Sequence, residues 1–89
     1  MPHWYVYILR SLSTPYLYIG STSDLHRRLF QHNNGLVRST KLYLPLQVAA
    51  YIAVSTETQT RTLEKYFKTG SGKAILKKSI LMDRTVAQV

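Results

Sequence analysis

The sequence contains no cysteine, and only four of its 89 residues carry a carboxylate side chain. Without cysteine the chain cannot form a disulfide framework, a thiolate zinc site or a cysteine nucleophile. No apolar run approaches the roughly 20 residues that span a bilayer, and the N-terminal segment lacks the basic region and cleavage site of a signal peptide. We therefore expect a cytoplasmic protein without membrane contact, and metal-dependent chemistry must draw on a short set of acids: Asp24, Glu57, Glu64 and Asp83.

The shortage of acids leaves a strongly basic chain. Twelve lysine and arginine residues against four acids give a formal net charge of +8 at pH 7. A surplus that large on so small a body attracts polyanions, of which nucleic acid is the usual one. The hydrophobic fraction of 45% and the charged fraction of 18% are otherwise typical of one globular domain, residues 1–89, with its core over about 4–78.

The first 20 residues predict a β-hairpin. Residues 4–9, Trp-Tyr-Val-Tyr-Ile-Leu, are rich in the aromatic and β-branched side chains that strands favour. Residues 13–15 supply turn chemistry, and residues 16–19 have the composition of the partner strand.

Four tyrosines occupy alternate positions in this hairpin. Because side chains alternate between the two faces of a strand, Tyr5 and Tyr7 share one face of the first strand. Tyr16 and Tyr18 share one face of the second strand for the same reason. If Tyr7 pairs with Tyr18, all four rings lie on one face of the sheet.

A helix is predicted over residues 24–33. Ser23 is a suitable N-cap, Asp24 suits the positive end of a helix, and the pair at 34–35, Asn-Gly, suits its C-terminus.

Two polar residues of this helix, Arg28 and His32, are one turn apart. They flank the apolar stripe formed by Leu25 and Leu29, which is expected to face the core. Both side chains should therefore point along the boundary between helix and sheet rather than into solvent.

The second half of the chain predicts a strand and two helices. Residues 36–45 form a basic loop, and residues 47–54 are nearly all apolar, which suits a buried central strand. A capping box at 56–59 opens a helix that closes at Gly70. Residues 73–78 are expected to form a short third helix.

On the predicted second helix, Leu63 and Phe67 form the buried stripe and Glu64 lies at its border, which is an unusual place for a purely solvating acid.

The elements follow the order strand, strand, helix, strand, helix, with a short final helix. This order predicts an α/β (α+β) fold, a small sandwich in which helices cover a three-stranded, mainly antiparallel sheet.

The spacing of these residues resembles the signature of the GIY-YIG nuclease family. The chain carries Tyr5-Val6-Tyr7, then Tyr18-Ile19-Gly20, then Arg28 and His32 on one helix and Glu64 on the next. The sequence most resembles small stand-alone bacterial members, which are related to the nuclease domain of the excinuclease subunit that cuts DNA in nucleotide-excision repair.

Two residues depart from the family pattern. Tyr5 replaces the glycine of the first triplet, a change that a strand interior tolerates because glycine is a weak choice there. Ser21 stands where the repair nucleases carry a lysine, so a cation that could help to activate a tyrosine is missing.

The resemblance implies a metal-dependent endonuclease that hydrolyses DNA phosphodiester bonds. It implies catalytic roles for Tyr7, Tyr18, Arg28 and His32, and one Mg²⁺ or Mn²⁺ ion at Glu64. It also implies structural roles for Tyr5, Val6, Ile19, Gly20 and Asn33.

The same residue types suit phosphodiester hydrolysis on physical grounds. The reaction needs an activated water and stabilisation of the charge that develops on the phosphoryl and leaving oxygens. Tyr7 or Tyr18 could position or deprotonate the water if nearby cations favour its phenolate, and the choice between them stays open. Arg28 offers a bidentate fork to phosphate, and His32 can hold a tyrosine or move a proton. Glu64 can hold one Mg²⁺, which often takes only one or two carboxylates plus waters and substrate phosphate.

The partner expected from the charge is DNA, with RNA as the alternative polyanion. No segment resembles an element that reads base sequence, so recognition is expected to depend on the backbone or the shape of the substrate, or on a partner protein. The backbone contacts are assigned to Arg27, Arg38, Lys41, Arg61, Lys65, Lys68, Lys73, Lys77 and Lys78.

Each candidate residue also has a purely structural interpretation. Tyrosines pack well in strands, and Glu64 could be a surface ion-pair partner, which is worth under about 1 kcal/mol. The second functional hypothesis is therefore an adaptor that binds nucleic acid or protein with little or no turnover, and Ser21 favours it. A third is a basic protein of the ribosome or of an anionic membrane surface, and the membrane version is disfavoured because no helix has a broad apolar face.

Overall fold

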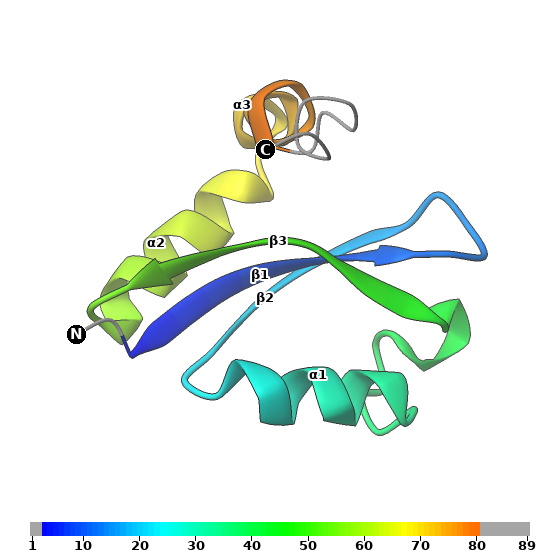
Figure 1. Ribbon diagram of the computed structural model, residues 1–89. Helices are drawn as coiled ribbons and strands as arrows, with labels where there is room; N and C mark the ends of the chain where they lie inside the picture. The colour runs from blue at the N-terminus through cyan, green and yellow to red at the C-terminus, as the bar shows by residue number, and fades with distance from the viewer. Residues whose placement is uncertain (1–2, 81–89) are drawn as a thin grey trace.

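The computed structural model describes residues 3–80, so Asp83 lies outside the described part of the chain. The fold is the expected α+β sandwich, with an antiparallel three-stranded sheet between helices (Figure 1). A 3₁₀ turn, Lys41–Tyr43, precedes the last strand, and a π-helical turn, Leu76–Ile80, follows the last helix. The strands and helices are β1 (Trp4–Ser11), β2 (Leu17–Thr22), α1 (Leu25–Asn33), β3 (Leu46–Val54), α2 (Glu57–Phe67) and α3 (Gly70–Ile75).

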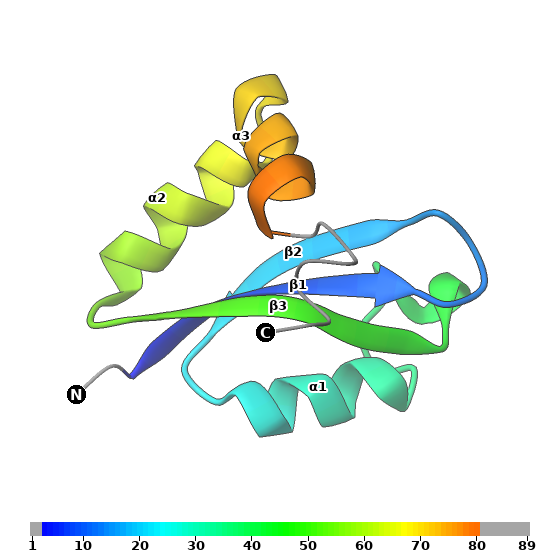
Figure 2. The same ribbon diagram turned by 45° about the horizontal axis from the view of Figure 1, so that its top comes forward.

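The strand order in the sheet is β2-β1-β3, with α1 on one face and α2 and α3 on the other (Figures 1 and 2). The expectation that residues 47–54 form the central strand is therefore wrong, because β1 is central and β3 is an edge strand. The apolar run of β3 looked like a strand buried on both faces, but Tyr51 and Ala53 are exposed. In β1, by contrast, four consecutive residues from Val6 to Leu9 are buried.

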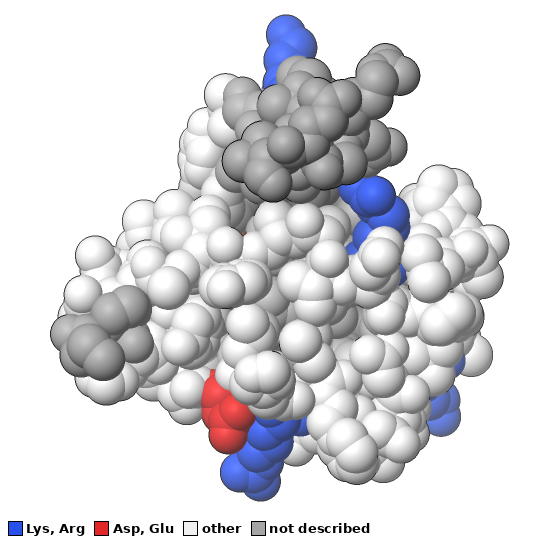
Figure 3. Space-filling model, viewed as in Figure 1, with Lys and Arg blue, Asp and Glu red and all other residues white. Residues whose placement is uncertain are grey.

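The surface over β3 carries little charge. Figures 1 and 2 together place β3 nearest the viewer of Figure 1 and β2 at the rear. Figure 3 shows that most of this near face is uncharged, with lysine and arginine side chains at its margins. The basic residues of the described chain are therefore not gathered over β3.

The register of the hairpin differs by two residues from the one in which Tyr7 would pair with Tyr18. Tyr7 pairs with Gly20, and Tyr18 pairs with Leu9, so the register that the sequence allowed, with Tyr7 opposite Tyr18, does not form. A shift of two residues leaves every side chain on its original face, since the side-chain repeat of a strand is two. Tyr7 and Tyr18 therefore still share a face, with their ring centroids 6.2 Å apart.

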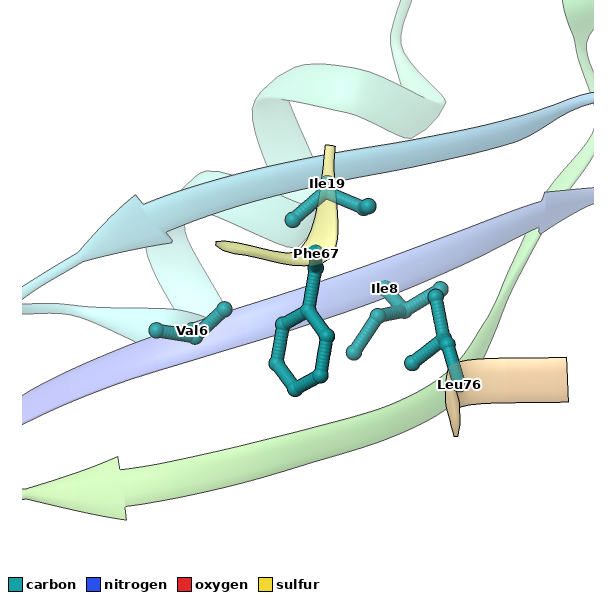
Figure 4. Packing of buried hydrophobic residues seen from close by; sticks show 5 residues of the cluster. All are labelled: Val6, Ile8, Ile19, Phe67 and Leu76. Atoms are coloured by element: carbon teal, nitrogen blue, oxygen red, sulfur yellow. The ribbon is translucent and has the colours of Figure 1, made fainter. Parts of the chain in front are cut away.

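The larger core lies between the sheet and α2, α3 and the last turn. Its buried residues are Val6, Ile8, Ile19, Phe67 and Leu76 (Figure 4). The expected apolar stripe of the second helix is confirmed, because Phe67 is buried here and Leu63 packs against this cluster. Burial of these apolar side chains stabilises the packing of the helices on that face of the sheet.

A second core lies on the opposite face, under α1. Tyr7, Leu9 and Leu46 are buried there, and Leu25 and Leu29 of α1 pack against them. The expected stripe of the first helix is therefore confirmed, and it fixes the rotation of α1 against the sheet.

The helix ends follow local hydrogen bonding. Asp24 rather than Ser23 is the N-cap of α1, since its carboxylate accepts from the backbone N–H of Arg27. Gly35, with φ +72°, follows the end of this helix in the left-handed conformation that glycine adopts most easily.

The described residues include no helix of the length and apolar character needed to cross a membrane.

The second helix has the expected capping box but ends earlier than expected. The Thr56 hydroxyl accepts from the backbone N–H of Gln59, whose side chain returns to the Thr56 N–H. Its C-cap is Lys68, and Thr69 then caps α3, so Gly70 begins a new helix rather than closing α2. The short third helix is thus confirmed, with an earlier start.

Candidate active site

The hydroxyl of Tyr7 is the centre of a polar cluster between β1 and α1. It lies 2.9 Å from Nε2 of His32 and accepts a hydrogen bond from Nε of Arg28 at 3.3 Å. Tyr7 and His32 are both 0% exposed. A strand residue and two helix residues that are distant in sequence thus converge on one oxygen atom.

The helical spacing explains this convergence. Arg28 and His32 are one turn apart on α1, beside the Leu25 and Leu29 side chains that pack against the sheet. The sequence predicted that both side chains follow the boundary between helix and sheet, and their shared contact with Tyr7 confirms it.

Tyr18 completes the aromatic part of the cluster. Its ring centroid is 5.1 Å from that of His32 and 6.2 Å from that of Tyr7. Tyr18 is half-buried, whereas Tyr7 has no exposed surface, so Tyr18 presents the more accessible of the two phenols.

His32 is held neutral by its surroundings. Burial, assisted by the positive charge of Arg28, lowers the pKa of His32 to about 4. Its second ring nitrogen, Nδ1, lies 2.7 Å from the hydroxyl of Thr40, which is also fully buried. At neutral pH the imidazole is therefore uncharged and carries one proton, on either Nδ1 or Nε2.

Arg28 is oriented by two hydrogen bonds from its guanidinium. Its Nε donates to Tyr7, and its Nη1 donates to Oε1 of Gln31 at 3.0 Å. The hydrogen bond to Tyr7 is the main reason that the pKa of Arg28 is raised, and Tyr18 contributes in the same direction. The guanidinium is a permanent positive charge beside both phenols.

Opposing effects act on the phenol of Tyr7. Burial raises the pKa of Tyr7, and the negative field of Glu64 and the neighbouring Tyr18 add to the rise. The hydrogen bond from Arg28 lowers the pKa but does not cancel the effect of burial. In the free protein Tyr7 is therefore a neutral phenol at pH 7.

Glu64 is the one candidate that does not touch the cluster. It lies on α2, which covers the other face of the sheet, and its field still reaches Tyr7. One carboxylate oxygen accepts from Nζ of Lys68 at 2.9 Å, and the Glu64 side chain is 25% exposed. The structure thus brings four of the five expected catalytic and metal residues together and places the acid within electrostatic range.

The structural positions of the signature have identifiable roles. Val6 and Ile19 belong to the larger core, and Gly20 is buried beside Tyr7. Tyr5 packs edge-to-face against Tyr51 at 6.1 Å, so this strand position accommodates a tyrosine in place of glycine. The Asn33 side chain accepts from the backbone N–H of Leu46 at 3.3 Å, which joins the end of α1 to β3.

All nine basic residues assigned to backbone contacts are exposed. Three of them, Arg61, Lys65 and Lys68, surround Glu64 at a shallow hollow on α2. Arg61 and Lys68 are paired with Glu57 and Glu64 at 2.8 and 2.9 Å. Positive charge therefore adjoins the carboxylate expected to hold a metal.

The sequence analysis did not identify two residues that hydrogen-bond to the cluster, Thr40 and Gln31. Thr40 lies in a loop, eight residues after His32, where neither helical nor strand periodicity indicates direction. Gln31 precedes His32 on α1, and its contact with Arg28 three residues earlier is an ordinary helical spacing that carries no functional signal by itself.

Comparison of the sequence with known proteins shows the family to which the chain belongs. Residues 3–78 match the family model of the GIY-YIG catalytic domain, and the chain belongs to this nuclease family. It is 56% identical over 34 residues to a UPF0213 protein of Pectobacterium carotovorum subsp. carotovorum, and 35% identical over 69 residues to the UPF0213 protein YsiG of Lactococcus lactis subsp. lactis. These matches cover 38% and 76% of this chain, and 33% and 65% of the two relatives.

Proposed function

We propose that the protein is a metal-dependent endonuclease that hydrolyses DNA phosphodiester bonds by recognising the backbone or the shape of its substrate. The observation that carries the proposal is the convergence of Arg28 and His32 on the buried hydroxyl of Tyr7. A phenol acts as a base near neutral pH only when its anion is stabilised, and a guanidinium with an imidazole N–H supplies that stabilisation.

We assign a separate catalytic role to each of Tyr7, Tyr18 and Arg28. Tyr7, with two potential donors at its oxygen, is the better candidate for the base, and the more accessible Tyr18 is placed to orient the water. Only two of the five N–H groups of Arg28 make the bonds to Tyr7 and Gln31, so its guanidinium can also hold a phosphate oxygen.

The residues present fit one hard divalent cation. Glu64 offers a partly exposed carboxylate, and Mg²⁺ commonly binds one or two carboxylates together with waters and substrate phosphate. Within residues 3–80, no three histidine or acidic side chains gather into a potential metal cluster, so the protein would supply few ligands. When bound, the ion supplies positive charge against the phosphate and leaving oxygens.

Nicking of supercoiled plasmid tests the proposal directly. With Mg²⁺ or Mn²⁺ the wild-type protein should nick the plasmid, and Tyr7→Phe, Arg28→Ala and Glu64→Gln should each lower the rate by about 10²–10³-fold. Thr58→Ala is the control, because this exposed residue of α2 lies outside the cluster and has no assigned contact with DNA, so its replacement should change the rate only slightly. Equal nicking by all variants would show that the activity comes from a contaminant.

A second candidate is a nucleic-acid adaptor with little turnover. The observation that favours it is the complete burial of Tyr7, whose hydroxyl is enclosed by protein in the free state. An adaptor would bind DNA with a steep salt dependence, as any basic surface does, and would show no metal-dependent nicking. Binding without nicking in the assay above would select this candidate.

A further inference from the structure

Thr40, His32 and Tyr7 form a buried chain of hydrogen-bonding groups. The Thr40 hydroxyl lies 2.7 Å from Nδ1 of His32, and Nε2 lies 2.9 Å from the Tyr7 hydroxyl. All three residues are 0% exposed, so solvent does not supply missing partners to them. The direction of each hydrogen bond is therefore decided by the groups themselves.

The hydroxyl of Thr40 has one good acceptor. Its alternative, the carbonyl oxygen of Val37, lies 3.5 Å away, at the limit of hydrogen bonding. That carbonyl already accepts the backbone N–H groups of Thr40 and Lys41, both at 3.1 Å, so its two lone pairs are engaged. Because the contact with Nδ1 of His32 is much shorter, at 2.7 Å, than the 3.5 Å contact with Val37, we infer that Thr40 donates its proton to Nδ1.

This assignment fixes the other ring nitrogen as the protonated one. A neutral imidazole that accepts at Nδ1 carries its proton on Nε2 and donates it to the oxygen of Tyr7. Arg28 donates to the same oxygen from Nε. Two donors therefore point at Tyr7.

The number of protons in the Thr40–His32–Tyr7 chain favours the phenolate form of Tyr7 over the phenol form. Thr40, His32 and Tyr7 bring three protons to two short contacts, so while Tyr7 is a phenol one proton is left with the long 3.5 Å contact to Val37 or with no acceptor. If Tyr7 loses its proton, each remaining donor has an acceptor, and the phenolate receives bonds from His32 and Arg28.

We propose that Thr40 is a positioning residue, whose hydroxyl holds His32 in the Nε2–H tautomer so that the imidazole stabilises ionised Tyr7. The catalytic meaning rests on the proposed function, since the phenolate is the form of Tyr7 that accepts a proton from water. The tautomer itself is a property of the folded protein and is measurable without activity.

Nitrogen-15 NMR of the imidazole tests the tautomer. The sequence has three histidines, and His3 and His26 are exposed, so replacing both by glutamine leaves the signals of His32 alone. We expect Nε2–H in this protein and in its Thr40→Ser form. A protonated Nδ1 at neutral pH would overturn the proposal, whether or not the protein cleaves DNA.

Substitutions at Thr40 test the link to Tyr7. Thr40→Val keeps the volume but removes the hydroxyl, and should lower kcat about tenfold at neutral pH and move the alkaline rise in rate upward, as expected for a lost buried hydrogen bond. Thr40→Ser restores the hydroxyl and should stay within about twofold of wild type. If Thr40→Val kept both the Nε2–H tautomer and the pH profile of the wild-type protein, the proposal would be overturned. If the valine variant does not fold, the NMR measurement on the wild-type and Thr40→Ser proteins tests the proposal alone. A protonated Nδ1 in either protein would then overturn it.

Discussion

The phenolic oxygen of Tyr7 lies 2.6 Å from the point where a side chain at Gly20 would begin. These two residues are directly paired across β1 and β2, and the tyrosine extends over the glycine toward the free edge of the sheet. The glycine of the second signature triplet therefore leaves the space that the phenol occupies, and its role in this protein is steric rather than conformational.

Replacing Gly20 by alanine should displace Tyr7. The added methyl group would also lie 2.9 Å from the ring of the half-buried Tyr18, and Tyr7 is completely buried. We expect a loss of about 1–3 kcal/mol in unfolding free energy, as for other overpacked sites, and at least tenfold slower nicking. Thermal denaturation and the plasmid assay measure the two effects.

Gly70→Ala is the matched control for this change. A Cβ at Gly70 meets nothing within 4 Å, so the substitution should leave both stability and nicking close to wild type. If Gly20→Ala behaved like Gly70→Ala, the steric account of the signature glycine would be wrong.

Gly72 is expected to tolerate substitution even less than Gly20. A Cβ there would overlap the carbonyl of Tyr66, so α3 can pack on the end of α2 only if this position lacks a side chain. Gly72→Ala should lower the unfolding free energy by about 2–3 kcal/mol in a denaturant titration, because backbone cannot move aside as a side-chain tip can. An unchanged midpoint would show that α3 shifts freely on α2.

The elements of the fold could be predicted because each has a local cause. The hairpin follows from its alternating tyrosines, and the start of α2 follows from the Thr56 and Gln59 capping box. The position of β3 at the edge could not be predicted, because an apolar strand composition does not reveal whether a second neighbour exists. The hairpin register could not be predicted either, but a shift of two residues from the pairing of Tyr7 with Tyr18 keeps every side chain on the same face.

The site was predictable in part for the same reason. Arg28 and His32 have helical spacing, and the face shared by Tyr7 and Tyr18 follows from strand alternation. Thr40 contacts His32 only because the loop after α1 folds back over the helix end, and such loop geometry depends on tertiary packing. The side of the sheet on which Glu64 lies is set by the crossover into α2, which local spacing does not determine.

Removing the lysine that pairs with Glu64 should strengthen metal binding. Lys68 holds the carboxylate at 2.9 Å, and a cation at Glu64 would have to compete with it. Because exposed ion pairs are worth about 0.2–1 kcal/mol, Lys68→Gln should tighten Mn²⁺ binding by up to about fivefold. Calorimetric titration with Mn²⁺ measures the change.

Arg61→Gln is the control for that titration. It also removes one positive charge from the surroundings of Glu64, but Arg61 is bonded to Glu57 at 2.8 Å rather than to Glu64. Its effect on Mn²⁺ affinity should be the smaller of the two. Equal effects would mean that the general field, and not the Lys68 contact, controls access to the carboxylate.

The rate of nicking should rise with pH well beyond neutrality. Burial raises the pKa of Tyr7, with Tyr18 and Glu64 acting in the same direction and Arg28 in the opposite one. The basic form is therefore scarce at pH 7 and increases about tenfold for each pH step below that pKa. His32, with a pKa of about 4, is already neutral at pH 6 and should add no inflection between pH 6 and 8.

A pH profile of kcat at saturating metal and DNA checks this prediction. A metal-bound water also ionises at alkaline pH, and the two sources are separated by Thr40→Val, which should move the rise only if Tyr7 is the ionising group. Tyr7→Phe should abolish the rise together with most of the activity. A bell-shaped profile centred near pH 6.5 would instead indicate a titrating imidazole, and would contradict the neutral state of His32 that its burial imposes.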